Sequence, residues 1–196
     1  MLASIHPLGE RARHSRWGIT VSAYLAGSVA GGALAGGVLG LAGELVGSLL
    51  RSGPQLVAVV VLLVGATGVA LDLGWGRLPT IRRQVNEDWL ARYRGWVYGA
   101  GFGFQLGLGV VTIVSSAAVY VTFALALLAG SFPAGLAIGG TFGLVRGSAV
   151  LAAAHVREPG QLRALHGRIQ QLAPLARGAA AAGLALLAAV GSGALV

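Results

Sequence analysis

Long apolar runs separated by short polar stretches constrain this chain more than any other feature. Of its 196 residues, 56% are hydrophobic and only 10% are charged, whereas a typical soluble domain carries about 25% charged residues. A helix of about 20 apolar residues crosses the roughly 30 Å hydrocarbon core of a bilayer. The apolar segments cover residues 18–50, 55–73, 95–130, 134–155 and 177–196. The pattern predicts an all-α integral membrane protein with a bundle of five transmembrane helices, and it excludes a soluble globular domain.

The distribution of arginine predicts how these spans are oriented. The net charge is +8, and all 14 basic residues are arginine. Twelve of the 14 lie before residue 18, between residues 74 and 94, or between residues 156 and 177. Because cytoplasmic loops of membrane proteins carry the excess of positive charge, we expect these three regions on the inner side, with the N-terminus in and the C-terminus out. Residues 1–17 then form a cytoplasmic segment, and residues 18–196 form a single transmembrane domain, in the plasma membrane of a bacterium.

Two of the inner connections mix apolar residues with charges. Residues 81–93 include Val85, Trp89 and Leu90, and residues 161–172 carry leucine or isoleucine at helical intervals. Either connection could be a solvated loop or an amphipathic helix at the level of the lipid headgroups. The regular spacing favours the amphipathic helix in the second connection, and both interpretations stay open in the first.

Glycines recur at four-residue intervals in the first apolar segment. Small residues at this spacing let helix backbones approach closely, in a solvent that gives helices no hydrophobic drive to associate. These glycines serve either packing within the chain or a contact face for a partner subunit. With two glycines of the third segment, the expected helix-packing residues are Gly27, Gly31, Gly32, Gly36, Gly40, Gly43, Gly47, Gly103 and Gly107.

The third apolar segment combines glycines with hydroxyl side chains. Five glycines between residues 99 and 109 precede Thr112, Ser115 and Ser116. Because glycine weakens a helix, this order predicts a helix that bends or opens near its middle. Broken helices of this kind form substrate and ion sites in transporters. The alternative is close packing, with the hydroxyls bonded back to their own helix.

Arg146 is the most unusual charge, because it lies about twelve residues into the fourth apolar segment. A charge at that depth is either functional or extends toward the inner face, where Asp72 could pair with it. Glu44 in the first segment could reach the outer headgroups and Arg51. The candidate buried polar or transport site therefore comprises Arg146, Gln105, Thr112, Ser115, Ser116 and Tyr120, with Asp72 and Glu44 as ion-pair partners.

Catalytic and metal-binding patterns do not stand out. The chain has no cysteine, which excludes thiol chemistry of its own. The four histidines show no metal-ligand spacing. We therefore expect a protein that is not an enzyme and has no cofactor or metal.

Two motifs suggest a family. The run from Gly101 to Gly107, GFGFQLG, precedes a long helix, and Arg77-Leu78-Pro79 precedes Arg82-Arg83. They resemble the start of the fourth helix and the loop after the third helix in the CcdA/DsbD family of cytochrome c biogenesis and thiol-reductant transporters. The resemblance implies a similar helical fold. The family's first helix and its cysteine have no counterpart here, and its second cysteine falls near Val110 and Val111, so no thiol relay can run through this chain alone.

The function expected from these features is that of a membrane subunit. The first hypothesis is a CcdA/DsbD-like, non-redox accessory or transporter-like subunit of a membrane complex. The second is a self-sufficient transporter of a small solute or ion, acting as a homo-oligomer. The third is a scaffold that docks a cytoplasmic partner through residues 81–94 and 161–177. Expected partners are the lipid bilayer and either another membrane protein or further copies of the chain, and no nucleic acid is expected.

Overall fold

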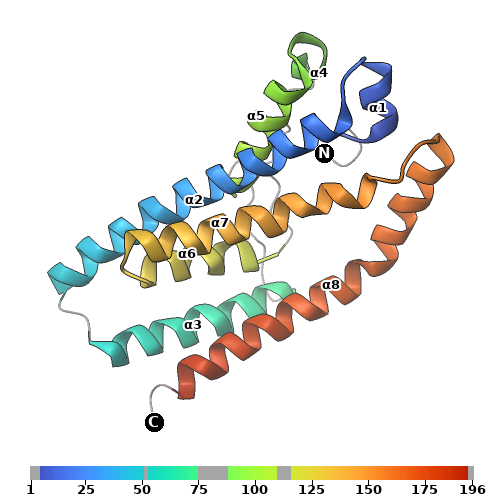
Figure 1. The fold of residues 1–196 in the computed structure, drawn as a ribbon. Helices are drawn as coiled ribbons and strands as arrows, with labels where there is room; N and C mark the ends of the chain where they lie inside the picture. Colours follow the sequence, from blue (N-terminus) through green and yellow to red (C-terminus); the bar gives the residue numbers. More distant parts are fainter. Residues whose placement is uncertain (1–4, 51–52, 75–87, 110–115, 194–196) are drawn as a thin grey trace.

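The computed structural model describes residues 5–50, 53–74, 88–109 and 116–193, and every regular element in these ranges is a helix (Figure 1). The elements are α1 (Pro7–Ala12), α2 (Trp17–Leu50), α3 (Pro54–Asp72), α4 (Asp88–Arg92), α5 (Gly95–Gly107), α6 (Ala118–Leu128), α7 (Phe132–Ser148), the 3-10 helix η1 (Ala149–Ala153) and α8 (Pro159–Gly193). The prediction of an all-α chain is confirmed for the described residues.

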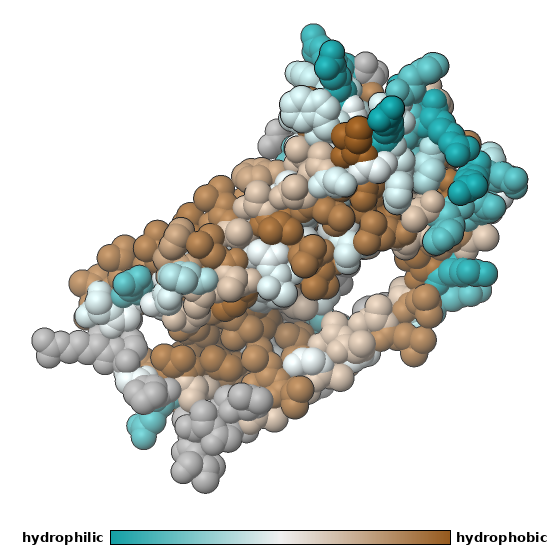
Figure 2. All heavy atoms as spheres, viewed as in Figure 1, coloured by the Kyte–Doolittle hydropathy of each residue, from teal (hydrophilic) through white to brown (hydrophobic). Residues whose placement is uncertain are grey.

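Three of the described helical stretches are long and apolar enough to cross a membrane: Trp17–Leu49, Gln55–Asp72 and Phe132–Ala153. They coincide with the first, second and fourth predicted spans. Large apolar side chains on them, such as Leu49, Leu63 and Val145, are exposed. Figure 2 shows hydrophobic residues along the length of the molecule, and hydrophilic residues gathered at the end where α1, α4 and the connection from α7 to α8 lie. An apolar surface of this extent suits contact with lipid.

The third apolar segment, predicted as one span over residues 95–130 that bends or opens near its middle, contains two helices. Helix α5 ends at Gly107, and α6 begins at Ala118. Gly109 has φ +75°, a left-handed conformation that glycine adopts without the steric cost of a Cβ atom. The interruption expected near the middle of the segment is therefore present. Residues 110–115, which include Val110, Val111, Thr112 and Ser115, lie outside the described residues.

The C-terminal part of the chain also differs from the prediction. The inner connection and the fifth span were expected to be separate, but residues 159–193 form the single helix α8. Pro174 lies inside this helix, where it removes one backbone hydrogen bond without ending it. The helix predicted over residues 161–172 is present as its first half. Among the described residues, α8 is not one of the three helical stretches that are long and apolar enough to cross a membrane.

Helix α2 is the centre of the fold, and α7 packs against it in the opposite direction. Ser28 donates a buried 2.7 Å hydrogen bond to the carbonyl oxygen of Gly143. Farther along, a Cβ atom added to Gly32 would overlap the Gly139 carbonyl, and one added to Gly36 would overlap the Gly135 carbonyl. The two backbones therefore touch over several turns, which only small residues permit.

Helices α5 and α6 pack against successive parts of α2, and both run in the same direction as α2. Gly99 of α5 faces the backbone of Thr20, and Gly107 faces that of Ser28. Farther along α2, Gly43 faces the carbonyl of Leu127 near the end of α6. The two short helices, of 13 and 11 residues, thus cover successive parts of one 34-residue helix.

The glycines of α2 contact elements of the same chain. Gly27 and Gly31 face α5, Gly32, Gly36 and Gly40 face α7 and the residue before it, and Gly43 faces the end of α6. Gly103 and Gly107 face Tyr24 and Ser28 from the other side. At Gly47 an added Cβ would meet no atom within 4 Å. Packing within the chain therefore accounts for all of these glycines except Gly47.

A second layer consists of α3 and α8, which lie side by side (Figure 1). It joins the first layer through α6. A Cβ atom at Gly68 of α3 would lie 2.8 Å from Val121 of α6 and 3.1 Å from Leu184 of α8. Ala117, Val121 and Leu184 form the buried cluster at this junction. This contact places the end of α3 beside the start of α6.

Gly36→Ala should destabilise the protein, because its methyl group would overlap the backbone of α7. Overpacking of this kind costs about 1–3 kcal/mol, which lowers the melting temperature of a chain of this size by roughly 5 °C. Tryptophan fluorescence during heating in detergent measures the change. Gly47→Ala is the matched control and should be neutral or stabilising, since alanine favours helix. Equal melting temperatures for the Gly36 variant and the wild type would contradict the close contact of α2 with α7.

Candidate functional site

Asp72, the last residue of α3, caps the start of α6. Its Oδ1 accepts a 2.6 Å hydrogen bond from the backbone N–H of Ala117, and its Oδ2 accepts a 2.8 Å bond from the Ser116 hydroxyl. The Ser116 oxygen in turn accepts a 3.1 Å bond from the N–H of Ala118. The first N–H groups of a helix lack partners within the helix and carry partial positive charge. A carboxylate from another helix therefore satisfies and neutralises this end of α6.

Arg146 of α7 lies at the opposite side of the interruption. It is half-buried, and its Nη1 lies 3.4 Å from the carbonyl oxygen of Leu106, to which it donates. Its guanidinium also lies 5.5 Å from the centre of the Phe142 ring, within the range of a cation–π interaction. Leu106 belongs to the last turn of α5, where helix carbonyls carry partial negative charge. The arginine therefore complements the end of α5.

The two charges lie at the two helix ends that the interruption creates. Asp72 of α3 meets the positive end of α6, and Arg146 of α7 meets the negative end of α5. The two helix ends lie against the middle of α2, because α5 covers the first half of α2 and α6 covers the second. Half-helix ends at such a depth are where transporters bind ions and substrates. These two helix ends, with Asp72, Ser116 and Arg146, are the candidate site.

The structure describes three of the remaining predicted polar residues. Gln105 of α5 and Tyr120 of α6 are half-buried, and Glu44 of α2 is exposed. The residues outside the described ranges include Thr112, Ser115 and Arg51. The predicted pairing of Glu44 with Arg51 therefore also lies outside the described residues. In the described part of the chain, no three His, Asp or Glu side chains gather as metal ligands would.

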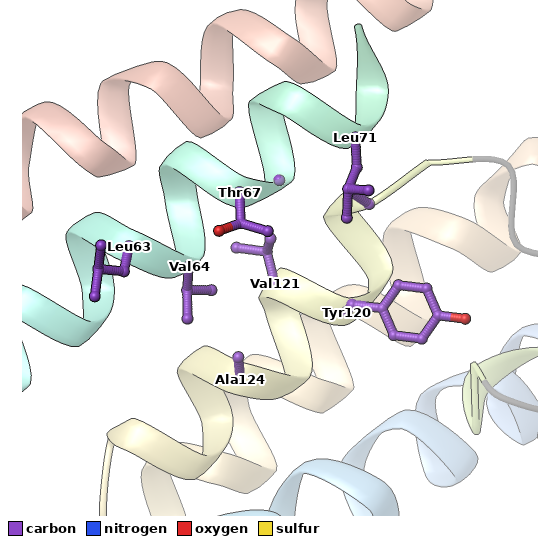
Figure 3. A pocket seen from close by; sticks show the side chains of 9 residues that line it. Leu63, Val64, Thr67, Leu71, Tyr120, Val121 and Ala124 are labelled. Carbon is purple, nitrogen blue, oxygen red and sulfur yellow. The ribbon is translucent and has the colours of Figure 1, made fainter. Parts of the chain in front are cut away.

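An apolar cavity of about 320 Å³ lies between α3 and α6, next to the capped end of α6 (Figure 3). It is lined by Leu63, Val64, Thr67, Gly68, Leu71, Ala117, Tyr120, Val121 and Ala124. In Figure 3 the Tyr120 ring projects away from α3. The walls are almost entirely hydrocarbon, so the cavity suits an apolar group rather than an ion.

Glu10 forms a buried polar cluster that the sequence analysis did not single out. Its fully buried carboxylate accepts hydrogen bonds of 2.7 Å from Arg13, 2.7 Å from Thr20 and 2.5 Å from Tyr98. Partial burial alone would lower the pKa of Arg13, but the bonds to Glu10 and Tyr98 outweigh it and raise that pKa. The cluster fastens α1 to α2 and α5. The available signal was that Glu10 is the single acid among the first 17 residues and lies three residues before Arg13.

Asp72→Ala should destabilise the protein by about 1 kcal/mol, the usual cost of losing a helix cap. The melting temperature should fall by roughly 3 °C. Asp72→Asn is the matched variant and should melt between Asp72→Ala and the wild type, because the amide keeps one accepting oxygen for the N–H of Ala117 but loses the second acceptor and the negative charge. The same thermal unfolding in detergent measures both variants. If Asp72→Ala melted like the wild type, the capping contact would be refuted.

Comparison with known proteins identifies relatives of this chain. Five curated proteins match, and all are named methylamine utilization protein MauF. The protein of Methylobacillus flagellatus is 30% identical over 149 residues, which cover 74% of this chain and 52% of the relative. That of Methylophilus methylotrophus is 33% identical over 135 residues, covering 67% and 46%. That of Paracoccus denitrificans is 33% identical over 180 residues, covering 90% and 62%.

These relatives correct the resemblance drawn from the sequence motifs. All five matches carry the name MauF, and none is a CcdA/DsbD protein, so the identification with the cytochrome c biogenesis family is wrong. Glycine-rich helices and basic loops are shared by many helical bundles, which explains how the pattern misled. No family model and no solved structure matches the chain. The chain spans about half the length of the curated relatives and is similar to them over most of its own length.

Proposed function

We propose that this chain is a multi-pass membrane protein that serves methylamine utilization as a non-redox accessory protein. The observation that carries the proposal is the similarity to five proteins named for methylamine utilization, at 30–33% identity over 130 to 180 residues. The absence of cysteine supports the non-redox part, because any thiol chemistry would have to come from a partner. The proposed role is therefore to assist other proteins rather than to carry out catalysis.

The proposed topology has five crossings of the bacterial inner membrane, with the N-terminus in and the C-terminus out. Three apolar helices of spanning length support the first, second and fourth crossings. The third crossing would consist of α5 followed by α6, because both run in the same direction along α2. The apolar second half of α8 would make the fifth. The gathering of hydrophilic residues at one end supports this orientation (Figure 2).

Transport of a small solute or ion is the second candidate function. It is favoured by the interrupted crossing, where Asp72 and Arg146 complement the ends of two half-helices. Such a transporter would work alone or as a homo-oligomer. The scaffold hypothesis has less support, because residues 161–177 belong to the long helix α8 rather than to a loop.

Deletion of the gene in its native host tests the proposal. The deletion strain should lose growth on methylamine as the sole carbon source and keep its growth on succinate, since an accessory protein of this pathway is needed for one substrate only. Growth curves on the two media measure the effect. A plasmid copy of the wild-type gene should restore growth on methylamine.

Unchanged growth of the deletion strain on methylamine would overturn the proposed role. That result would leave transport of an unrelated solute as the better candidate. A loss of growth on both media would also contradict the proposal, because it would indicate a general membrane function.

A further inference from the structure

A second cavity, of about 380 Å³, lies where α7 and η1 turn into α8. It is lined by Ala152, His155, Val156, Gln161, Ala164, Leu165 and Arg168. One part of this lining is apolar, and the rest consists of two basic side chains and an amide. Figure 2 shows the surface hollowed between α7 and α8 close to the hydrophilic end. The cavity therefore differs from the one beside α6, which is almost wholly apolar.

The charge around this cavity is positive. Arg168 and His155 are exposed, and Arg157 and Arg163 lie on the same connection and helix. Glu158 is the one acidic residue between residues 149 and 176. The salt bridge found among the described residues joins Arg13 to Glu10 at another place in the fold. The cavity thus offers a positive charge to an anion.

The position along the helices corresponds to the lipid headgroups. The apolar stretch Phe132–Ala153 ends beside Ala152, which lines the cavity. The charged residues that follow, from Arg157 onward, begin the hydrophilic end of the molecule. A phosphate at this depth can contact basic side chains while a chain attached to it remains in the apolar layer.

We propose that this cavity binds the phosphate of an anionic phospholipid of the surrounding bilayer. Arg168 supplies the permanent positive charge, and His155 adds a second polar contact. The Oε1 atom of Gln161 accepts a 2.7 Å bond from the backbone N–H of Arg157, which leaves its amide NH₂ group free to donate to the phosphate. Val156, Ala164 and Leu165 contact the first part of an acyl chain. A free phosphate would leave that apolar wall unfilled, which favours the lipid over a soluble anion.

Thermal unfolding of the purified full chain in detergent tests this site. Phosphatidylglycerol should raise the melting temperature more than phosphatidylcholine at equal concentration, because only the former carries a net negative charge. Arg168→Gln should weaken the apparent affinity for phosphatidylglycerol about fivefold, as expected for one basic residue at a membrane surface. Arg163→Gln is the matched control, because Arg163 lies on the same helix but does not line the cavity. It should retain the affinity of the wild type.

Three results would overturn the assignment. An equal effect of the two lipids would show that the headgroup charge is not recognised. An equal loss in Arg163→Gln and Arg168→Gln would show attraction to the surface in general. Inorganic phosphate that shifts the melting temperature as much as phosphatidylglycerol would show a site for a soluble anion. None of these results bears on growth on methylamine, so the lipid site and the proposed function fail separately.

Discussion

Direct contact between helix backbones is the interaction on which the rest of this structure depends. In lipid, apolar side chains gain little by leaving their surroundings, so helices associate through close packing and hydrogen bonds. Ser28, Gly32 and Gly36 of α2 meet the backbone of α7, and the hydroxyl of Ser28 bonds directly to a carbonyl there. On another side of α2, Gly27 and Gly31 admit α5 in the same way. Larger residues at these positions would force the three helices apart.

This close packing also explains how an interrupted helix can be held near the centre of the bundle. Because α5 and α6 each pack against α2, each of the two helices is held in place by its own contacts. The interruption leaves backbone groups at two helix ends without helical partners, which is costly away from water. Asp72 and Arg146 reach these ends from α3 and α7. The packing positions the charges, and the charges make the interruption tolerable.

The glycine spacing was sufficient to predict the packing helices, and the polar composition of the third segment was sufficient to predict its interruption. The partners were not predictable, because they are set by helices far apart in sequence. Asp72 was one possible partner of Arg146, and its described bonds are to Ser116 and Ala117. Glu10 escaped notice because its partners Thr20 and Tyr98 come together only in the fold. The helix over residues 161–172 and the fifth span were expected as separate elements, but they form one 35-residue helix, in which Pro174 removes one hydrogen bond without ending it.

Helices α5 and α6 cover successive halves of α2 and run in the same direction. The chain has no cysteine, so engineered pairs can be cross-linked without background. Ala35→Cys with Val119→Cys should form a disulfide, because these side chains meet in the cluster between α2 and α6. Ala35→Cys with Val97→Cys should not, since the start of α5 lies beside Thr20, about 20 Å away along α2. Both double variants are oxidised in native membranes, and the mass of the intact protein then shows whether the disulfide has formed. Cross-linking of the second pair, or failure of the first, would contradict the account.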